Sequence, residues 1–203
     1  MKLYYSAGAC SLSPHIVLQE SGLPFEMVPA NMKTHQLKDG SDYYGINPKG
    51  YVPVLELDNG ERLSEGPAIV QYIADLVPAK QLAPAAGTMA RYRVIEWLNF
   101  ISTEVHKGFS PLFNAAMPAE AKTISLDKLA TRYKYVDEQL AQRSYLMGDD
   151  FSVADAYLFT VTTWARHVGL DLSGFKNLEA FMTRMRERPA VKAALKAENP
   201  AAA

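Results

Sequence analysis

The 203 residues include only one cysteine, neither sign of charge is in excess, and no long apolar run is present. The lone cysteine, Cys10, cannot form an internal disulfide, which fits a reducing compartment and leads us to expect the cytoplasm. The 21 basic and 22 acidic residues leave a net charge of −1, so we expect neither nucleic acid nor a membrane as a partner. No segment has the length of a membrane span, and we expect no secretory leader after Met1.

The apolar content of 48% is ordinary for a globular protein of one or two domains. Short strands are predicted over 2–5, 24–28, 52–57 and 61–63, separated by helical runs and by a polar, irregular stretch over 31–44 that includes one helical turn. The resulting order, β-α-β-α-β-β-α, is that of a thioredoxin-like domain. After residue 87 the pattern is helical throughout. We therefore predict a thioredoxin-like domain over 1–80, a linker over 81–87 and an all-helical domain over 88–203.

Cys10 follows the first predicted strand and comes just before a helix that is expected to run from Ser11 to Gly22. Unpaired N–H groups and the positive end of the helix dipole gather at such a point, and both favour a thiolate over a thiol. Because the thiolate is the nucleophile, Cys10 is a candidate reactive residue. The alternative is a small, buried and inert side chain, which is the usual state of a free cysteine.

Two proline-containing stretches are further candidates. Pro53 lies in a predicted strand, although proline removes one hydrogen-bond donor from the sheet. Either it begins the strand as an ordinary trans proline, or it forms a cis bend that turns the Val52 backbone toward a peptide-like ligand.

Ser64-Glu65-Gly66-Pro67 opens the next helix. Its residues suit helix capping, but the same helix N-terminus can bind a carboxylate while Glu65 pairs with an ammonium. Together these groups would bind an amino-acid head group.

A single long helix is predicted from Met89 to Ser110, stopped by Pro111. Val94, Leu98, Ile101 and Val105 follow helical spacing and form an apolar seam. A second stripe on this helix is polar and uncharged, which suits the wall of a cleft, although a solvated surface position is the alternative for its histidine. The members of that stripe are Asn99, Thr103, His106 and Ser110.

Further helices are predicted over 126–143, 178–188 and 191–197. Between the first two, Ser152-Val153-Ala154-Asp155 resembles a capping box that begins a nearly apolar helix. Asp155 is therefore interpreted as structural. The arginines Arg184, Arg186 and Arg188 are interpreted as a solvated face.

Taken together, these stretches resemble the cytosolic glutathione transferases, and specifically the bacterial beta class. The resemblance covers essentially the whole chain in order and at the spacing of the family. It is carried by Gly8-Ala9-Cys10-Ser11-Leu12-Ser13-Pro14-His15, Asn47-Pro48-Lys49-Gly50-Tyr51-Val52-Pro53, Ser64-Glu65-Gly66-Pro67-Ala68-Ile69, Trp97-Leu98-Asn99-Phe100, His106-Lys107-Gly108-Phe109 and Phe151-Ser152-Val153-Ala154-Asp155.

The resemblance implies glutathione as co-substrate, no metal, and a homodimer. It implies that Cys10 faces the glutathione sulfur, that Val52 is the backbone clamp before a cis proline, and that Glu65 and Gly66 bind the γ-glutamyl group. The helical-domain wall is implied to be Asn99, Thr103 and His106. The chain departs from the family at position 35, where a lysine is expected and His35 stands, so that Lys33 or Lys38 could supply the charge for the glycine carboxylate.

The chemistry implied is attack of a glutathione thiolate on an electrophilic small molecule, with Cys10 and His106 as the catalytic residues. Because the residue at the sulfur is a cysteine, a mixed disulfide between Cys10 and glutathione would also allow thiol transfer. The expected electrophile pocket comprises Phe109, Phe113, Tyr157 and Trp164. Two alternatives are a glutathione-dependent oxidoreductase, for example a reductive dehalogenase, and a non-enzymatic protein that binds a ligand or partner on the same fold.

Overall fold

The computed structural model describes residues 1–198 and divides the chain into two compact units. Of the described residues, unit 1 comprises 1–83 and 188–198, and unit 2 comprises Pro84–Glu187. The division after residue 83 falls within the expected linker. At the other end the grouping differs from the expected helical domain over 88–203, because the last helix packs with unit 1. Residues 199–203 of that expected domain lie outside the described residues.

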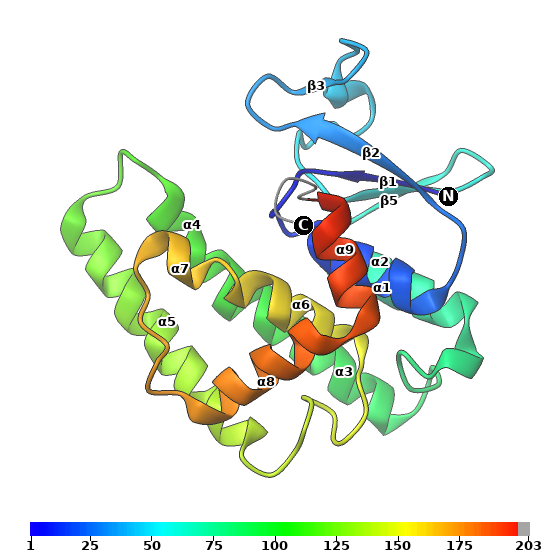
Figure 1. Cartoon of the computed structure of the whole chain (residues 1–203). Helices are drawn as coiled ribbons and strands as arrows, with labels where there is room; N and C mark the ends of the chain where they lie inside the picture. Colours follow the sequence, from blue (N-terminus) through cyan, green and yellow to red (C-terminus); the bar gives the residue numbers. More distant parts are fainter. Residues whose placement is uncertain (199–203) are drawn as a thin grey trace. The chain divides into compact units, whose positions relative to one another are not determined.

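Unit 1 is built on a mixed sheet with the strand order β3-β2-β1-β4-β5 (Figure 1). The first strand is parallel to β2, with Leu3 opposite Met27, and antiparallel to β4, with Leu3 opposite Leu55. Leu3 and Leu55 are completely buried, so the register places the apolar residues of both strands in the core. The strands are β1 (Lys2–Tyr5), β2 (Glu26–Asn31), β3 (Gln36–Leu37), β4 (Val54–Glu56) and β5 (Arg62–Ser64).

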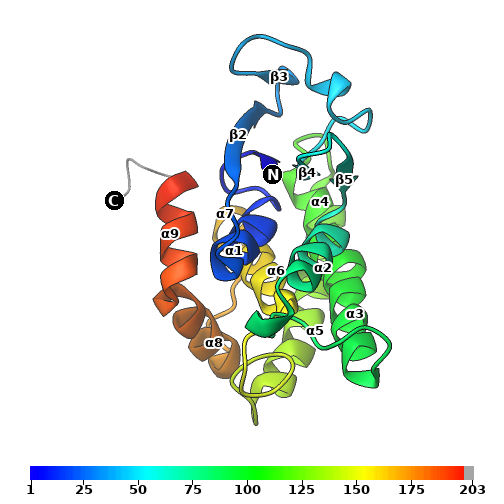
Figure 2. The same ribbon diagram turned by 90° about the vertical axis from the view of Figure 1, so that its right-hand side faces the viewer.

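The helices of unit 1 are α1 (Leu12–Ser21), α2 (Gly66–Leu76) and α9 (Pro189–Glu198), with a 3-10 turn η2 (Pro78–Lys80) after α2. As predicted, α1 ends at Gly22, whose φ of 72° is a left-handed conformation that glycine adopts without strain. Helix α1 is almost entirely buried because it is covered by α2 and α9. Both ribbon views show α9 beside α1 (Figures 1 and 2).

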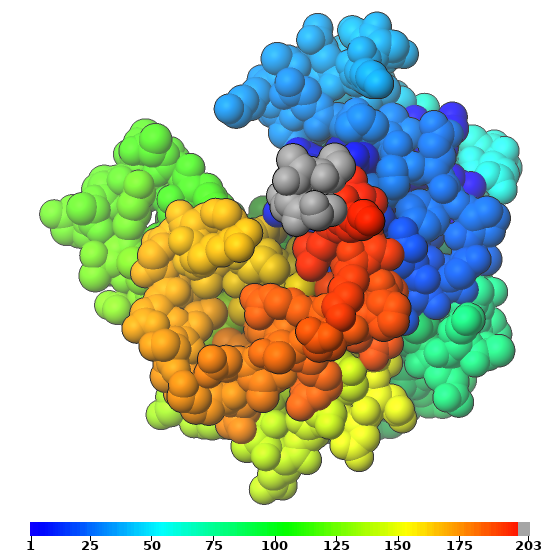
Figure 3. Space-filling model, viewed as in Figure 1, coloured from blue at the N-terminus to red at the C-terminus, as the bar shows by residue number. Residues whose placement is uncertain are grey.

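The thioredoxin-like fold class is confirmed, with local differences in the elements. The second strand begins at Glu26 rather than at residue 24 and runs on through Pro29 to Asn31. The stretch 31–44 contains the two-residue strand β3 and leads into the 3-10 turn η1 (Tyr43–Gly45), which corresponds to the one helical turn expected in this stretch. A strand of two residues is too short to produce a periodic apolar pattern, so the sequence does not reveal β3. This segment forms the upper edge of unit 1 in Figure 3.

Unit 2 is helical in all of its regular elements. They are α3 (Met89–Phe100), a π-helical segment η3 (Ile101–His106), α4 (Lys107–Phe113), α5 (Ala119–Leu140), α6 (Val153–Thr162), α7 (Ala165–Val168) and α8 (Lys176–Glu187). The predicted apolar seam, which runs along α3 and η3, is confirmed, since Val94, Leu98, Ile101 and Val105 are each at most 1% exposed. No helix of the described residues is sufficiently long and apolar to span a bilayer.

The prediction of one uninterrupted helix ending before Pro111 is wrong in two respects. The segment η3 interrupts the α-helical hydrogen-bond pattern, and α4 continues past Pro111 to Phe113. Proline removes one backbone donor, but only two helical residues follow it, so little helix is lost. The predicted helix over 126–143 also begins earlier, at Ala119, and ends at Leu140.

The start of α6 is organised by Asp155, as predicted. Its carboxylate accepts hydrogen bonds from the Leu146 and Ser152 N–H groups and from the Ser152 hydroxyl, each at 2.8 Å, and the side chain is fully buried. Asp155 therefore stabilises both the helix start and the preceding turn. The interpretation of the C-terminal arginines as a solvated face is wrong for two of them. Arg184 donates to the Ser144 carbonyl oxygen at 2.6 Å, and Arg188 donates to Glu20 at 2.7 Å.

Candidate functional site

Cys10 lies in the loop between β1 and α1, immediately before Ser11, the N-cap residue of α1. It is half-buried, and its thiol donates to the carbonyl oxygen of Val52, with the sulfur 3.3 Å from that oxygen. The Ser11 hydroxyl does not cap the helix as serine often does; it donates to the Ser6 carbonyl oxygen at 3.1 Å and accepts from the Ser6 N–H at 3.2 Å. These two bonds close the loop on itself, so Cys10 is held at a defined place ahead of the helix.

Glu198 at the end of α9 also supports the Cys10 loop. One carboxylate oxygen lies 2.9 Å from His15 Nδ1, and the other accepts from the Gly8 N–H at 2.9 Å. The side chains of His15 and Glu198 are 0% and 4% exposed. This pair was not identified from the sequence, since no local pattern links residues 183 positions apart.

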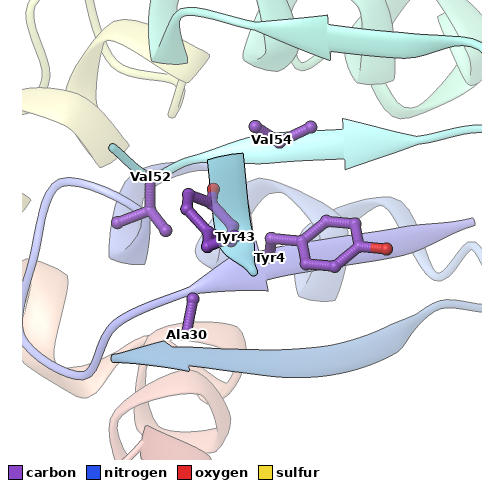
Figure 4. Packing of buried hydrophobic residues seen from close by; sticks show 5 residues of the cluster. All are labelled: Tyr4, Ala30, Tyr43, Val52 and Val54. Atoms are coloured by element: carbon purple, nitrogen blue, oxygen red, sulfur yellow. The ribbon is translucent and has the colours of Figure 1, made fainter. Parts of the chain in front are cut away.

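The Val52–Pro53 peptide bond is cis, as the resemblance implies. The carbonyl of the preceding residue, Tyr51, accepts from the Asn47 side-chain amide at 2.6 Å and from the Tyr43 hydroxyl at 3.2 Å. Burial raises the pKa of the Tyr43 phenol, and the nearby Tyr4 and Cys10 raise it further, so this hydroxyl stays a donor. Figure 4 shows the Tyr43 ring packed between Val52 and Tyr4. The backbone that leads to Val52 is thus held from within the core.

Glu65 is the N-cap residue of α2, and its backbone has a positive φ of 75°, which is rare for residues other than glycine. The expected cap by Ser64 is absent, because Ser64 is the last residue of β5. The Glu65 carbonyl oxygen accepts from the Ala68 and Ile69 N–H groups, each at 3.0 Å. Its carboxylate is 56% exposed and contacts Lys49 Nζ and, at 2.9 Å, the Tyr51 hydroxyl. Sequence reasoning identified Glu65 but missed these two partners.

His35 adopts a left-handed conformation with φ at 52°, and its ring lies 4.7 Å from that of Tyr44. Its Nδ1 atom is buried and has no hydrogen-bond partner. Lys33 and Lys38 are exposed on the same segment and line a hollow of about 750 Å³ beside β2 and β3, together with Asn31 and Gln36. This part of unit 1 therefore offers two exposed ammonium groups and one partly hidden imidazole to an anion.

The predicted electrophile residues come together in unit 2 around Trp164. Its ring lies 5.6 Å from Phe109, 5.9 Å from Phe113 and 4.9 Å from His106, centroid to centroid. His106 Nδ1 is 2.6 Å from the Tyr157 hydroxyl oxygen, so this hydrogen bond fixes the orientation of the imidazole ring. Phe113 is 55% exposed, whereas Phe109 is completely buried, so Phe113 is the aromatic ring of this group that presents most surface.

Asn99 and Thr103 are exposed and His106 is half-buried. Thr103 donates to the Asn99 carbonyl oxygen at 3.0 Å. Because η3 intervenes, the stripe does not keep the strict α-helical spacing from which it was predicted. A π-helical segment of this kind occurs often at functional sites.

Two family models match the chain. The N-terminal domain of glutathione S-transferases matches residues 7–76, and the C-terminal domain of glutathione S-transferases matches residues 100–189. The chain is 50% identical to glutathione S-transferase GstA of Escherichia coli O157:H7 over 198 residues, which cover 98% of both chains.

Solved structures agree. A ternary complex of BphK, a bacterial glutathione S-transferase, is 55% identical with a TM-score of 0.97, over 98% of this chain and 100% of that one. The beta-class glutathione S-transferase of Sphingomonas chungbukensis is 46% identical with a TM-score of 0.94, over 98% of each chain. Fold and site thus define a thioredoxin-like enzyme with a thiol ahead of its first helix. The chain belongs to the glutathione S-transferase family, close in structure to its bacterial beta class.

Proposed function

We propose that this glutathione S-transferase binds glutathione through unit 1, with Cys10 at the sulfur, Val52 at the cysteinyl backbone, and Glu65 with Gly66 at the γ-glutamyl head group. The observation that carries the proposal is the Cys10–Val52 contact, because it joins a thiol to the backbone group that would clamp a peptide-like ligand. The exposed carboxylate of Glu65 at the start of α2 adds a partner for an ammonium beside N–H groups that suit a carboxylate.

For the glycine carboxylate of glutathione we propose Lys33 or Lys38 as the counter-ion. Both ammonium groups are exposed on the hollow beside β2 and β3, whereas the Nδ1 atom of His35 is buried under its neighbours. His35 would then contribute to glutathione binding through the shape of the turn, which its left-handed backbone sets. Its ring nitrogen Nε2 is the atom proposed to contact the ligand.

The reaction proposed is conjugation. The glutathione thiol loses its proton to solvent or to a base, the thiolate attacks an electrophilic carbon, and a C–S bond forms as a leaving group such as chloride departs or as an activated alkene accepts the electrons. Donors near the sulfur stabilise the thiolate. Asn99, Thr103 and His106 are assigned to the glutathione wall on the family resemblance, with His106 as a hydrogen-bond or proton-transfer partner of the thiolate.

The electrophile is proposed to lie against the aromatic group around Trp164. Phe113 offers an exposed face for a flat apolar molecule, while Phe109, Tyr157 and Trp164 form the buried support behind it. Aromatic side chains on one wall favour aromatic substrates through offset or edge-to-face contacts. The class of substrate proposed is therefore a hydrophobic electrophile.

A second activity is proposed because the residue at the sulfur is a cysteine. The Cys10 thiolate attacks the glutathione sulfur of a mixed disulfide between glutathione and a second thiol, the S–S bond breaks, and the second thiol leaves as its thiolate while glutathione stays bound to Cys10. A further glutathione thiolate then attacks the bound glutathione sulfur, which releases the Cys10 thiolate and forms oxidised glutathione. Glutathione must resolve the mixed disulfide, because the chain has no second cysteine.

A homodimer in the cytoplasm is proposed as the working form. Large apolar side chains are exposed on α2 and on α3, with Leu76 45%, Met89 70% and Tyr92 58% accessible. Exposed apolar groups of this kind commonly mark a surface that associates with another protein chain. The cytoplasm is favoured by the lone half-buried thiol, which a reducing compartment would preserve.

Turnover assays test these functions against one another. The enzyme is incubated with a chloronitrobenzene and glutathione, and in parallel with a glutathione-containing mixed disulfide. Glutathione-dependent release of chloride supports conjugation, and turnover of the disulfide alone would make the oxidoreductase the main role. Absence of both, with ligand binding retained, would identify a non-enzymatic binding protein.

A further inference from the structure

The Asn47-Pro48-Lys49-Gly50 turn fixes the position of one ammonium group beside Glu65. The Gly50 N–H donates to the Asn47 carbonyl oxygen at 2.8 Å, and the Lys49 N–H donates to the Asn47 side-chain oxygen at 3.1 Å. Gly50 has φ at 74°, and a Cβ there would lie 2.6 Å from the Tyr44 ring, so the tight turn depends on glycine. Asn47 is buried, which anchors the base of the turn in the core.

From this turn the Lys49 side chain reaches the Glu65 carboxylate. Its Nζ atom and the Tyr51 hydroxyl both contact Oε1 of Glu65, and Nζ lies 5.3 Å from the centre of the Tyr51 ring. The hydrogen bond to Glu65 raises the pKa of the Lys49 ammonium, so this group stays charged at neutral pH. Glu65 thus already has a cationic partner within the chain.

The two members of this pair differ in freedom. The backbone of Glu65 is fixed at the start of α2 by the two N–H groups that donate to its carbonyl oxygen, and its carboxylate also accepts from the Tyr51 hydroxyl at 2.9 Å. Lys49 has a four-carbon flexible stem, and its side chain is 43% exposed. A second cation that approaches the same carboxylate would therefore move Lys49 rather than Glu65.

We propose that the ammonium group of Lys49 competes with the ammonium group of glutathione for the carboxylate of Glu65. Glutathione must displace Lys49 from this carboxylate in order to bind, so Lys49 sets affinity and selectivity for the γ-glutamyl head group. The proposal rests on the assignment of Glu65 to that head group. Two ammonium groups on one carboxylate repel each other, so binding of the ligand ammonium removes the favourable Lys49–Glu65 contact. Because the pair is exposed, the penalty is small and is reduced by salt.

The test measures dissociation constants by calorimetry for glutathione and for glutaryl-cysteinyl-glycine, which keeps the head-group carboxylate and lacks the ammonium. Lys49→Met should tighten glutathione binding about two- to fivefold at low salt, with a smaller gain at high salt. The analogue should show no gain. Lys49→Arg should behave as the parent protein does, and Lys80→Met, which removes an exposed charge of the same sign from η2, should have no effect on either ligand.

Unchanged or weaker glutathione binding in Lys49→Met would overturn the proposal, and so would an equal gain for both ligands, which would indicate a general charge effect. Glu65→Gln separates this failure from failure of the site itself. If Glu65→Gln weakens glutathione binding while Lys49→Met does not strengthen it, only the competitor role is wrong. If Glu65→Gln leaves glutathione affinity unchanged, the head-group assignment is wrong and the role of Lys49 falls with it.

Discussion

Replacement of Glu198 by alanine should destabilise unit 1 strongly. The carboxylate is 4% exposed and is bonded to both His15 and the Gly8 N–H. Each hydrogen bond to a charged group contributes about 1.5–3 kcal/mol, and removing one partner of a buried pair costs about 3–5 kcal/mol because the other is left unsatisfied. We therefore expect the free energy of unfolding to fall by about 3–5 kcal/mol.

The matched control is Arg188→Met. Arg188 directly precedes α9, the helix that carries Glu198, and its side chain pairs with Glu20 at 2.7 Å. These two side chains are more accessible, at 25% and 15%. A pair that is partly solvated contributes less, about 1 kcal/mol or below. Urea unfolding followed by circular dichroism gives both differences, provided that the slope of the transition is unchanged. A loss in Glu198→Ala no larger than in Arg188→Met would refute the view that the buried pair stabilises the unit.

Three further outcomes are expected. Gly108→Ala places a Cβ 2.8 Å from buried Leu129 and should cost about 1–3 kcal/mol in urea unfolding, whereas Gly174→Ala, with open space around it, should be nearly neutral. Arg62 holds the pKa of Glu56 below its ordinary value, so the stability from this pair is present above about pH 4.5 and is lost as pH falls through the folded pKa. Arg62→Met should lower the free energy of unfolding by about 0.2–1 kcal/mol at pH 7, and equal free energies for the two proteins at pH 7 would count against the pair. Sedimentation at micromolar concentration should show a dimer, and a purely monomeric species would contradict the proposed assembly.

Periodic apolar patterns made the helices of unit 2 predictable. Spacing along the chain identified the seam of Val94 and Leu98, which the structure confirms as buried. The same rule assumed a regular α-helix and so could not foresee η3, because a π-helical segment has no local sequence signal here. The stripe that includes Thr103 and His106 was consequently predicted from a spacing that the chain does not keep.

The candidate site was predictable where chemistry is local and unpredictable where it depends on the fold. Cys10 stands out as the lone thiol before a helix, and Glu65 as an acid at a helix start. The cis bond at Pro53 was expected only through the family resemblance, since cis is a minority state of such bonds. Two side-chain pairs, Lys49 with Glu65 and Glu198 with His15, join segments of the chain that no sequence pattern connects. These pairs are therefore visible only in the folded structure.

The central claim, that Cys10 faces the glutathione sulfur, is tested most directly by kcat/KM of Cys10→Ala for two reactions. Thiol transfer through a mixed disulfide requires the cysteine sulfur itself, whereas the glutathione thiolate in conjugation is stabilised by several donors, each worth about 1 kcal/mol. We predict that Cys10→Ala abolishes exchange with a glutathione mixed disulfide and only lowers conjugation of a chloronitrobenzene. Full retention of disulfide exchange would contradict the claim, and equal loss of both activities would contradict the division of roles and make Cys10 covalent in each.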